Sequence, residues 1–298
     1  MRQRYKLSLS DVTFYSLSYI FLIVCGIIII LPLLNVLAMS LSAPESVLSG
    51  RVFLLPRNFT LETYRLVINM PAIRIGYLNT FFYMTVGTLI NLVVTMCCAY
   101  PLSRRELVGR RFFTLFFTFT MLFSGGMIPT FLVIRNLGLL DTRMVMLLPN
   151  AMTVWNMILC RTFLWNTIPH ELYESAELDG ASDLRVLTSI VLPLSVPIIA
   201  VMALFYAVGT HWNSFFDAML YLRSPSLFNI QLVLRNAIAN IASIAGQDAN
   251  LAELTRNLAL AEATKYTIIM LSMIPVLIIY PFAQRYFIKG IMIGSLKG

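Results

Sequence analysis

An acidic segment inside an otherwise apolar chain is where residue types and spacing most clearly indicate a function. Residues 174–193 read ESAELDGASDLRVLTSIVLP, with Gly180 near the centre and apolar sequence on both sides. Glu171, Glu174 and Glu177 recur at every third position, so on a helix they form one ridge. The ridge is either a solvated acidic face near a helix N-terminus or a surface that binds a cationic groove on a partner.

The same segment predicts two short helices joined by a tight turn. Pro169 suits the first turn of a helix, and Gly180 can end that helix because glycine readily adopts positive φ. Ser182 or Asp183 can cap a second helix. An apolar stripe at helical spacing follows, made of Val186, Leu187 and Ile190. We therefore expect a helix–turn–helix at the membrane surface that moves together with the spans on either side of it.

Polar and aromatic side chains inside one apolar segment form the second candidate site. They are His211, Trp212, Asn213, Phe216 and Asp217. Polar residues within a membrane span are costly and often functional. These side chains either hydrogen-bond between packed helices or line a pathway, where aromatic faces and amides suit a sugar.

Glycine and asparagine residues in the apolar segments pose a similar choice. Gly125 and Gly126 precede Pro129, and together they either break a helix that lines a cavity or produce a plain kink at the proline. For three asparagines we favour hydrogen bonds between helices: Asn79, Asn91 and Asn156.

Catalytic and metal-binding patterns are missing from the sequence. The two histidines, His170 and His211, lie in different segments, and neither HExxH nor GxSxG occurs. No GxxxxGK[ST] phosphate loop occurs either, so we expect no ATP site, no metal and no cofactor in this chain. Four cysteines lie inside predicted spans and are expected to be buried thiols: Cys25, Cys97, Cys98 and Cys160.

Composition identifies the class of protein that must position these groups. Of 298 residues, 58% are hydrophobic and 12% are charged, with a mean hydropathy of +0.79. A soluble domain carries about 25% charged residues. Six segments are long enough to cross a bilayer: Val12–Met39, Asn79–Tyr100, Phe112–Ile134, Met144–Leu164, Leu194–Leu222 and Tyr266–Phe287. We predict one all-α domain over residues 1–298, with six transmembrane helices and a cytoplasmic coupling helix–turn–helix in the loop 165–193.

Two further expectations concern the ends of the chain and its orientation. The first apolar stretch is too long for a signal peptide, so we expect a retained span. Basic residues cluster in the short loop after the second span: Arg104, Arg105, Arg110 and Arg111. Because short basic loops stay cytoplasmic, both termini and the loop 165–193 are expected inside. The net charge of +8 then reflects topology rather than nucleic-acid binding.

The acidic segment also resembles a known motif. Glu174-Ser175-Ala176, Gly180 and Ile190-Val191-Leu192-Pro193 are similar to the EAA motif of ABC importer permeases, with Ser175 where alanine is usual. Further segments resemble the sugar-importing, maltose-permease-like branch, and within it the lipoprotein-linked permeases for complex oligosaccharides and oligouronides. They are Asp179-Gly180-Ala181, residues 123–130, 137–142 and 211–216, and a cytoplasmic tail with Gly290, Gly294 and Lys297.

The resemblance implies a multi-subunit importer in a bacterial cytoplasmic membrane. Two ABC ATPase subunits would carry the ATP and magnesium, a homologous second permease would complete the pathway, and an extracellular solute-binding protein would deliver an oligosaccharide. Glu174 would make the polar contact with an ATPase, Gly180 the turn, and Ala176 and Ala181 would allow close approach. The implied coupling residues are Glu174, Ser175, Ala176, Asp179, Gly180, Ala181, Ile190, Leu192 and Pro193.

Three alternatives remain at this point. A secondary transporter would need internal repeats and buried coupling-ion sites, yet Asp217 is the sole acid well inside a span. A membrane enzyme would need a catalytic cluster. A permease for a non-sugar solute would keep the EAA segment but lack the sugar-branch segments.

Overall fold

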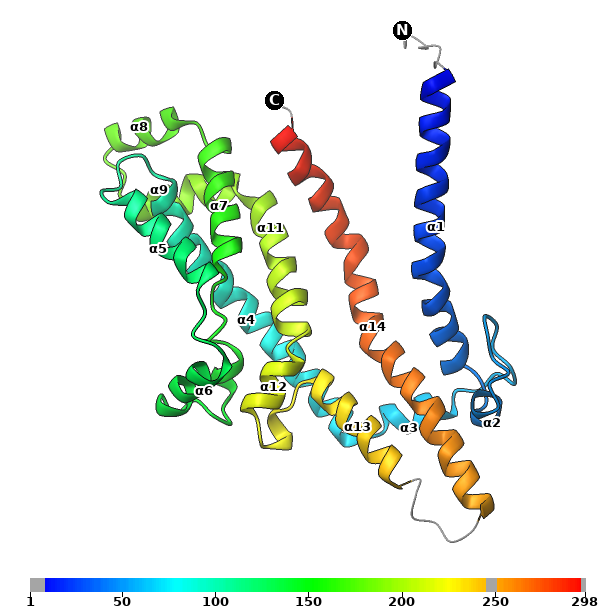
Figure 1. Ribbon diagram of the computed structural model, residues 1–298. Helices are drawn as coiled ribbons and strands as arrows, with labels where there is room; N and C mark the ends of the chain where they lie inside the picture. Colours follow the sequence, from blue (N-terminus) through cyan, green and yellow to red (C-terminus); the bar gives the residue numbers. More distant parts are fainter. Residues whose placement is uncertain (1–8, 245–250, 296–298) are drawn as a thin grey trace. The chain divides into compact units, whose positions relative to one another are not determined.

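The computed structural model describes residues 9–244 and 251–295, and helices are the only regular elements within these ranges (Figure 1). A single isolated bridge joins Ser42 and Phe59. The chain divides into two units, residues 1–70 with 236–273 and residues 71–235 with 274–298. The all-α class predicted from composition is confirmed.

Unit 1 contains a long apolar helix, two short helices, and parts of α13 and α14. The first three are α1 (Leu9–Ser40), α2 (Pro44–Leu48) and α3 (Glu62–Ile68), and the other two are α13 (Ile230–Ile244) and α14 (Leu251–Ser295). A small core joins Ala38, Val47 and Val52 to Ala263 of α14. The hydroxyls of Thr63 and Thr267 lie 2.7 Å apart, so α3 is tied to α14 within this unit.

Unit 2 is built around α4 (Pro71–Ser103), against which α7 (Val154–Thr167) and the π-helix η3 (Phe205–Trp212) pack. Figure 1 shows α7 and α11 (Val196–Leu204) beside α4. The remaining elements of the unit are α5 (Arg110–Leu122), α6 (Met127–Asn136), η1 (Arg143–Met146), α8 (His170–Leu178), α9 (Asp183–Val186), η2 (Leu187–Val191), α10 (Leu192–Leu194), α12 (Phe215–Tyr221) and η4 (Pro225–Leu227).

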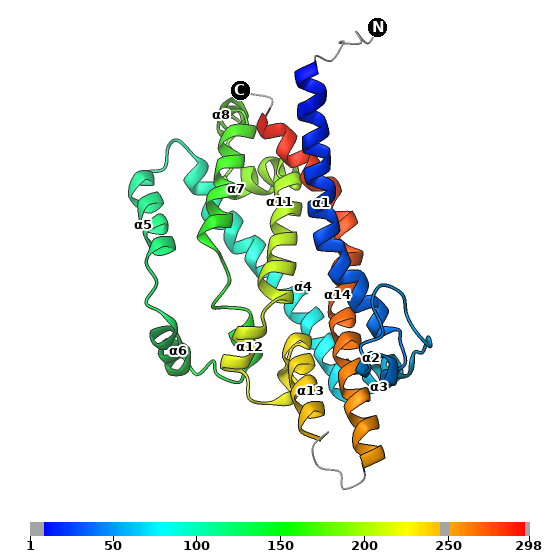
Figure 2. The same ribbon diagram turned by 45° about the vertical axis from the view of Figure 1, so that its right-hand side comes forward.

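The two ends of unit 2 carry different elements. Helices α8 and α9 lie at one end, whereas α6 and α12 lie at the other (Figure 2). At the α6 end, Asp141 accepts hydrogen bonds from the backbone N–H groups of Arg223 and Ser224, each at 2.8 Å. The predicted acidic loop and the predicted polar cluster are therefore separated along the unit.

Three helices are long and apolar enough to cross a membrane: Ser10–Ser40, Pro71–Ser103 and Glu253–Pro281. Two bent pairs also qualify if each pair is one span, namely Arg110–Leu122 with Met127–Asn136 and Asp183–Leu194 with Val196–Trp212. The described residues thus hold three to five spans by length and composition, and the division into six stays a prediction.

The segment Met144–Leu164 differs most from the expected span. The second half of this segment is helical and belongs to α7, which has 14 residues. Residues 147–153, just before α7, are irregular. Pro149 lies in this stretch and cannot donate a backbone hydrogen bond. Backbone groups without helical partners need other polar partners, and the structure supplies them for this stretch.

Bends lie within or at the edge of two other expected spans. The helices α5 and α6 meet at 111° across residues 123–126, so the helix is broken at Gly125 and Gly126, one of the two outcomes expected within Phe112–Ile134. Within Leu194–Leu222, the chain bends by 78° near Ser195 and then forms the π-helix η3. Between the fifth and sixth expected spans, α13 and the start of α14 occupy much of the interval 223–265.

Candidate functional site: a latched loop and a polar cavity

The acidic segment forms the predicted helix–turn–helix. Helix α8 ends at Leu178, and Gly180 adopts φ +69°, where a Cβ would be strained. Two hydrogen bonds close the turn: the Gly180 N–H donates to the carbonyl of Glu177 at 3.0 Å, and the Ala181 N–H donates to that of Ala176 at 2.9 Å. This pair of bonds is the Schellman motif, which satisfies the last carbonyls of a helix.

One face of the loop packs into the unit and the other is exposed. Tyr173, Ala176 and Val186 are buried in a core shared with α4 and α7, so the small Ala176 side chain faces inward. Ala181, Ile190 and Leu192 are half-buried against the same core. The exposed positions are Glu174, Ser175, Asp179, Gly180 and Pro193.

Arg104 anchors the loop to the end of α4. Its Nε donates to Glu106 Oε2 at 3.1 Å, and its Nη2 makes a hydrogen-bonded ion pair with Glu177 of α8. The guanidinium carbon also lies 4.2 Å from the centre of the Tyr173 ring, within cation–π range. The Arg104 side chain is only 10% exposed, so these contacts hold it between α4 and α8. Sequence analysis gave Arg104 a topological role alone.

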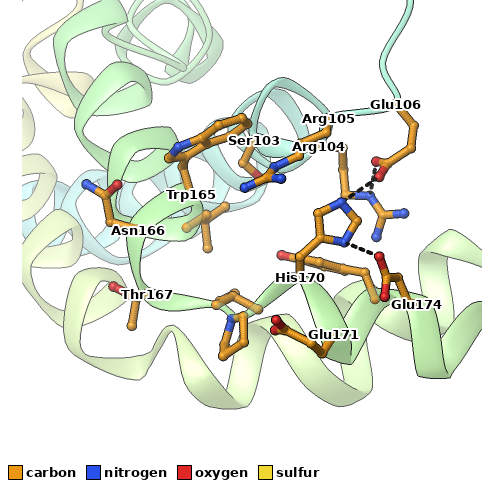
Figure 3. A pocket seen from close by; sticks show the side chains of 14 residues that line it. Ser103, Arg104, Arg105, Glu106, Trp165, Asn166, Thr167, His170, Glu171 and Glu174 are labelled. Atoms are coloured by element: carbon orange, nitrogen blue, oxygen red, sulfur yellow. Dashed lines mark hydrogen bonds and ion pairs between the residues drawn. The ribbon is translucent and has the colours of Figure 1, made fainter.

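His170, at the start of α8, adds further contacts. Together, Arg104, Glu106, His170 and Glu177 form a latch that ties α8 to the end of α4. His170 Nε2 lies 3.1 Å from Glu106 Oε1, and its Nδ1 lies 3.5 Å from Glu174 Oε1 (Figure 3). Burial acts to raise the pKa of Glu106, but its own backbone N–H, Arg104 and His170 outweigh burial and lower that pKa. Of the predicted acidic ridge, Glu177 thus pairs with Arg104, and Glu174 lies beside the His170 ring of the same helix. Glu171 is exposed and has no ion-pair partner among the described residues.

A cavity of about 480 Å³ opens beside this latch. Trp165 forms part of its wall, and the guanidinium carbons of Arg105 and Arg110 lie 5.3 and 4.6 Å from the centre of the indole ring. Figure 3 shows the polar and charged side chains that line it: Ser103, Arg104, Arg105, Glu106, Asn166, Thr167, His170, Glu171 and Glu174.

Sequence analysis missed several features of the loop. Leu178 and Leu184 are 90% and 70% exposed, an apolar pair beside the turn. Leu178, an apolar residue at the end of the acidic helix, is the sequence feature that could have predicted this exposed pair. The contacts of Arg104 with Glu177 and of Glu106 with His170 had no local signal, because each joins residues that lie far apart in the chain.

The predicted polar cluster in the fifth apolar segment splits into two environments. His211 and Trp212 are 1% and 2% exposed and pack between helices. His211 Nε2 lies 2.6 Å from Asn91 Oδ1, and a Cβ at Gly87 would collide with the His211 ring. Trp212 meets Phe81 edge-on, with ring centres 6.4 Å apart.

Asn213, Phe216 and Asp217 instead line an open cavity of about 220 Å³. Asp217 Oδ2 accepts a hydrogen bond of 2.8 Å from Asn150 Nδ2. The other lining residues are Asn150, Thr153, Gly209, Thr210 and Ser214. One wall is therefore the irregular stretch 147–153.

Neutral polar side chains hold that irregular stretch in place. Asn91 Nδ2 donates to the carbonyl of Asn150 at 2.5 Å, and the Thr153 N–H donates to the hydroxyl of Tyr206 at 3.3 Å. The Tyr206 hydroxyl also lies 2.7 Å from that of Thr95. Asn91 thus makes the hydrogen bonds between segments that its position predicted.

The remaining predicted residues lie elsewhere. Gly125 and Gly126 are exposed between α5 and α6, and Gly126 adopts φ +88°, so the chain leaves the helix there rather than kinking at Pro129. Neither glycine lines the Asp217 cavity. Gly290 and Gly294 lie in α14, and Lys297 lies outside the described residues. Across the described ranges, no group of three or more His, Cys, Asp or Glu side chains could hold a metal ion.

Comparisons with known proteins give the class. No family model matches the chain. It is 42% identical over 286 residues to the polygalacturonan/rhamnogalacturonan transport system permease protein YtcP of Bacillus subtilis (strain 168), covering 96% of this chain and 98% of that protein. It is 40% identical over 274 residues to Protein LplC of the same strain, covering 92% and 91%.

A solved structure agrees with these relatives. In the crystal structure of a bacterial ABC transporter involved in the import of the acidic polysaccharide alginate, one chain is 34% identical to this one. The two superpose with a TM-score of 0.84, covering 95% of this chain and 99% of that one.

The chain therefore belongs to the family of sugar and polysaccharide permeases of ABC transporters. The resemblance drawn from the EAA segment is confirmed, and the secondary transporter and the membrane enzyme are excluded. The chain is a membrane permease subunit and not an enzyme, because ATP is hydrolysed by partner ATPases. The family also implies a solute-binding protein.

Proposed function

We propose that this chain forms half of the translocation pathway of an importer for complex oligosaccharides or oligouronides. Support for the substrate class comes from YtcP, whose name specifies polygalacturonan and rhamnogalacturonan, and from the alginate importer. A homologous second permease completes the pathway, and an extracellular solute-binding protein delivers the sugar. ATP and magnesium bind to two ATPase subunits and not to this chain.

The observation that carries the proposal is the latched loop 165–193. Its outer face presents Glu174, Ser175, Asp179 and Gly180, and its inner face is tied to α4 through Arg104 and through the core around Tyr173. A partner that moves α8 therefore also moves the end of α4. Through this link, a partner that binds the loop differently in two nucleotide states would shift the permease between two conformations.

Orientation follows from the same loop. If the ATPases bind the exposed face of α8, this loop and both termini are cytoplasmic, in a bacterial cell membrane. The basic residues Arg105, in the loop after α4, and Arg111, in the first turn of α5, agree with that side, since short basic loops stay cytoplasmic. The predicted docking contacts of Glu174, Ser175, Asp179, Ala181, Ile190, Leu192 and Pro193 are part of this proposal.

The test changes the turn and the exposed acid in the intact importer. Glu174→Lys reverses one exposed charge, and Gly180→Val forces a β-branched residue to positive φ, at about 1–2 kcal/mol. We expect sugar-stimulated ATPase activity and uptake into proteoliposomes to fall by at least about tenfold, or roughly 1.4 kcal/mol of coupling.

A matched control separates coupling from charge. Glu62→Lys reverses an exposed acid in α3 and should leave both rates unchanged. Gel filtration of the complex and mass spectrometry of its subunits must show an ABC ATPase and a second permease in every variant. Assembled complexes with wild-type stimulation in both loop variants would contradict the proposal.

A further inference from the structure

The cavity beside Asp217 carries an inference that deepens the proposed function and rests on it. The cavity is open, holds about 220 Å³, and is walled by the irregular stretch 147–153 on one side and by η3 and α12 on the other. Non-helical backbone in a membrane protein is tolerated where it is buried in protein or lines a cavity. Here it lines a cavity, and Asn91 and Tyr206 satisfy two of its backbone groups, the Asn150 carbonyl and the Thr153 N–H.

The lining has the chemistry of a carbohydrate subsite. Asn150, Thr153 and Thr210 offer amide and hydroxyl groups that donate and accept hydrogen bonds. Phe216 is 52% exposed beside them and offers an apolar face. A few convergent polar groups next to an aromatic ring are what a small-molecule site requires.

Charge narrows the choice of ligand. Asp217 is the one charged side chain among the described residues that line the cavity, and no Lys or Arg lines it. Only Asp217 Oδ2 is engaged, by Asn150, and no described residue donates to Oδ1. A carboxylate with a free acceptor binds hydroxyl donors well, whereas it repels a second carboxylate.

We propose that this cavity is a subsite for uncharged sugar hydroxyls, with Asp217 as the residue that determines specificity. Asp217 accepts a hydrogen bond from a ring hydroxyl and keeps uronate carboxylates out of this half of the pathway. An oligouronide would therefore pass with its carboxylates turned toward the other permease. Asn150 is a positioning residue, because it holds the Asp217 carboxylate toward the cavity.

Equilibrium binding tests the proposal with two probes that share one sugar backbone, one carrying free carboxylates and the other carrying methyl esters. The probes are radiolabelled trigalacturonate and its neutral methyl ester, dialysed against the permease–ATPase complex in nanodiscs. Asp217→Asn is the sharp variant, because its amide oxygen can still accept from Asn150 while the charge is lost. We expect it to tighten trigalacturonate binding on the order of tenfold and to leave ester binding unchanged or up to about threefold weaker.

Two further variants keep the result interpretable. Asn150→Ala retains the charge of Asp217 and should preserve discrimination against trigalacturonate while weakening ester binding. Glu45→Gln removes an exposed charge from α2 and should change neither affinity. If Asp217→Asn shifts both probes equally, or shifts neither, the proposal is wrong.

The binding assay is independent of coupling. If the wild-type importer shows no ATP-driven sugar uptake, that result counts against the proposed function alone. An importer that takes up sugar normally, but whose affinity for the two probes does not respond to Asp217→Asn, would count against the subsite alone.

Discussion

Two segments of the molecule are held in place by different chemistry: the loop 165–193 at the α8 end, and the irregular stretch 147–153 beside the Asp217 cavity. At the loop, charged groups pair with one another, as Arg104 does with Glu106 and Glu177. Around the cavity, neutral amides and hydroxyls such as Asn91 and Tyr206 satisfy irregular backbone. Charged groups near water keep part of their hydration, so their desolvation penalty is small. Within a membrane, neutral polar groups carry a smaller desolvation penalty than charged ones.

The comparison teaches that the two regions should respond to different perturbations. The loop should be sensitive to pH and salt, because its contacts are ionic and its carboxylates are about half exposed. The region behind the cavity should be sensitive to volume, because its contacts are buried and close-packed. Three variants test this division, in order of decreasing expected effect.

Gly87→Val should have the largest effect on stability. Gly87 is buried in α4, and a Cβ there would collide with the His211 ring, which its own bond to Asn91 holds in place. Overpacking of this kind costs about 3 kcal/mol. We expect a lower midpoint of thermal unfolding in detergent, with no dependence of the loss on salt.

Gly209→Ala is the matched control for that variant. Gly209 lies in the neighbouring π-helix, and a Cβ there would meet no atom within 4 Å. It should therefore leave the unfolding midpoint nearly unchanged. An equal loss of stability in both variants would show that His211 does not fill the space beside Gly87.

Arg104→Gln should have the second largest effect, on coupling more than on stability. The change removes two ion pairs and the cation–π contact with Tyr173. We expect the free energy of unfolding to fall by only about 1–2 kcal/mol, because the two carboxylate partners stay partly hydrated. Sugar-stimulated ATPase activity should fall while basal activity and assembly persist.

Arg111→Gln separates the latch from topology. Arg111 is an exposed basic residue of the same region, so its loss removes an equal charge from the same side of the membrane. If both variants impair stimulation equally, Arg104 acts through charge balance and not through its contacts with α8.

Glu106→Gln should have the smallest effect, visible only in acid. The pKa of Glu106 is lowered in the folded chain, so its contribution to stability is present above its ordinary value near 4.5 and is lost as pH falls through the lower folded value. We expect the variant to flatten the acid side of the unfolding midpoint against pH, by at most about 1 kcal/mol after solvent screening. A profile parallel to that of the wild type would remove Glu106 from the latch.

Local features of the fold were predictable to different degrees. The turn at Gly180 and the two short helices follow from glycine's access to positive φ and from apolar spacing, both of which are local. The break at Gly125 and Gly126 was one of two readings that the sequence allowed for Phe112–Ile134, whereas nothing predicted the irregular stretch inside Met144–Leu164, because hydropathy cannot distinguish a straight helix from a broken one. A break depends on whether other segments satisfy the freed backbone groups.

The candidate sites show the same limit on what local sequence can predict. The motif that places the chain among ABC sugar permeases is continuous in sequence, so spacing was enough to find it. Membership of the cavity was not predictable in this way. Asp217 and His211 are near neighbours in one predicted cluster, yet one lines an open cavity and the other is buried against Asn91.

By itself, the amino-acid sequence determined the all-α membrane class, the importer family and the helix–turn–helix with its exposed acids. These depend on composition and on spacings within single continuous segments of the chain, such as residues 174–193. Only the tertiary structure decided that Arg104 latches Glu177, 73 residues away, and that Asn91 supports Asn150, 59 residues away. Such contacts depend on which helices pack together, and that packing is a property of the whole apolar surface that no single segment encodes.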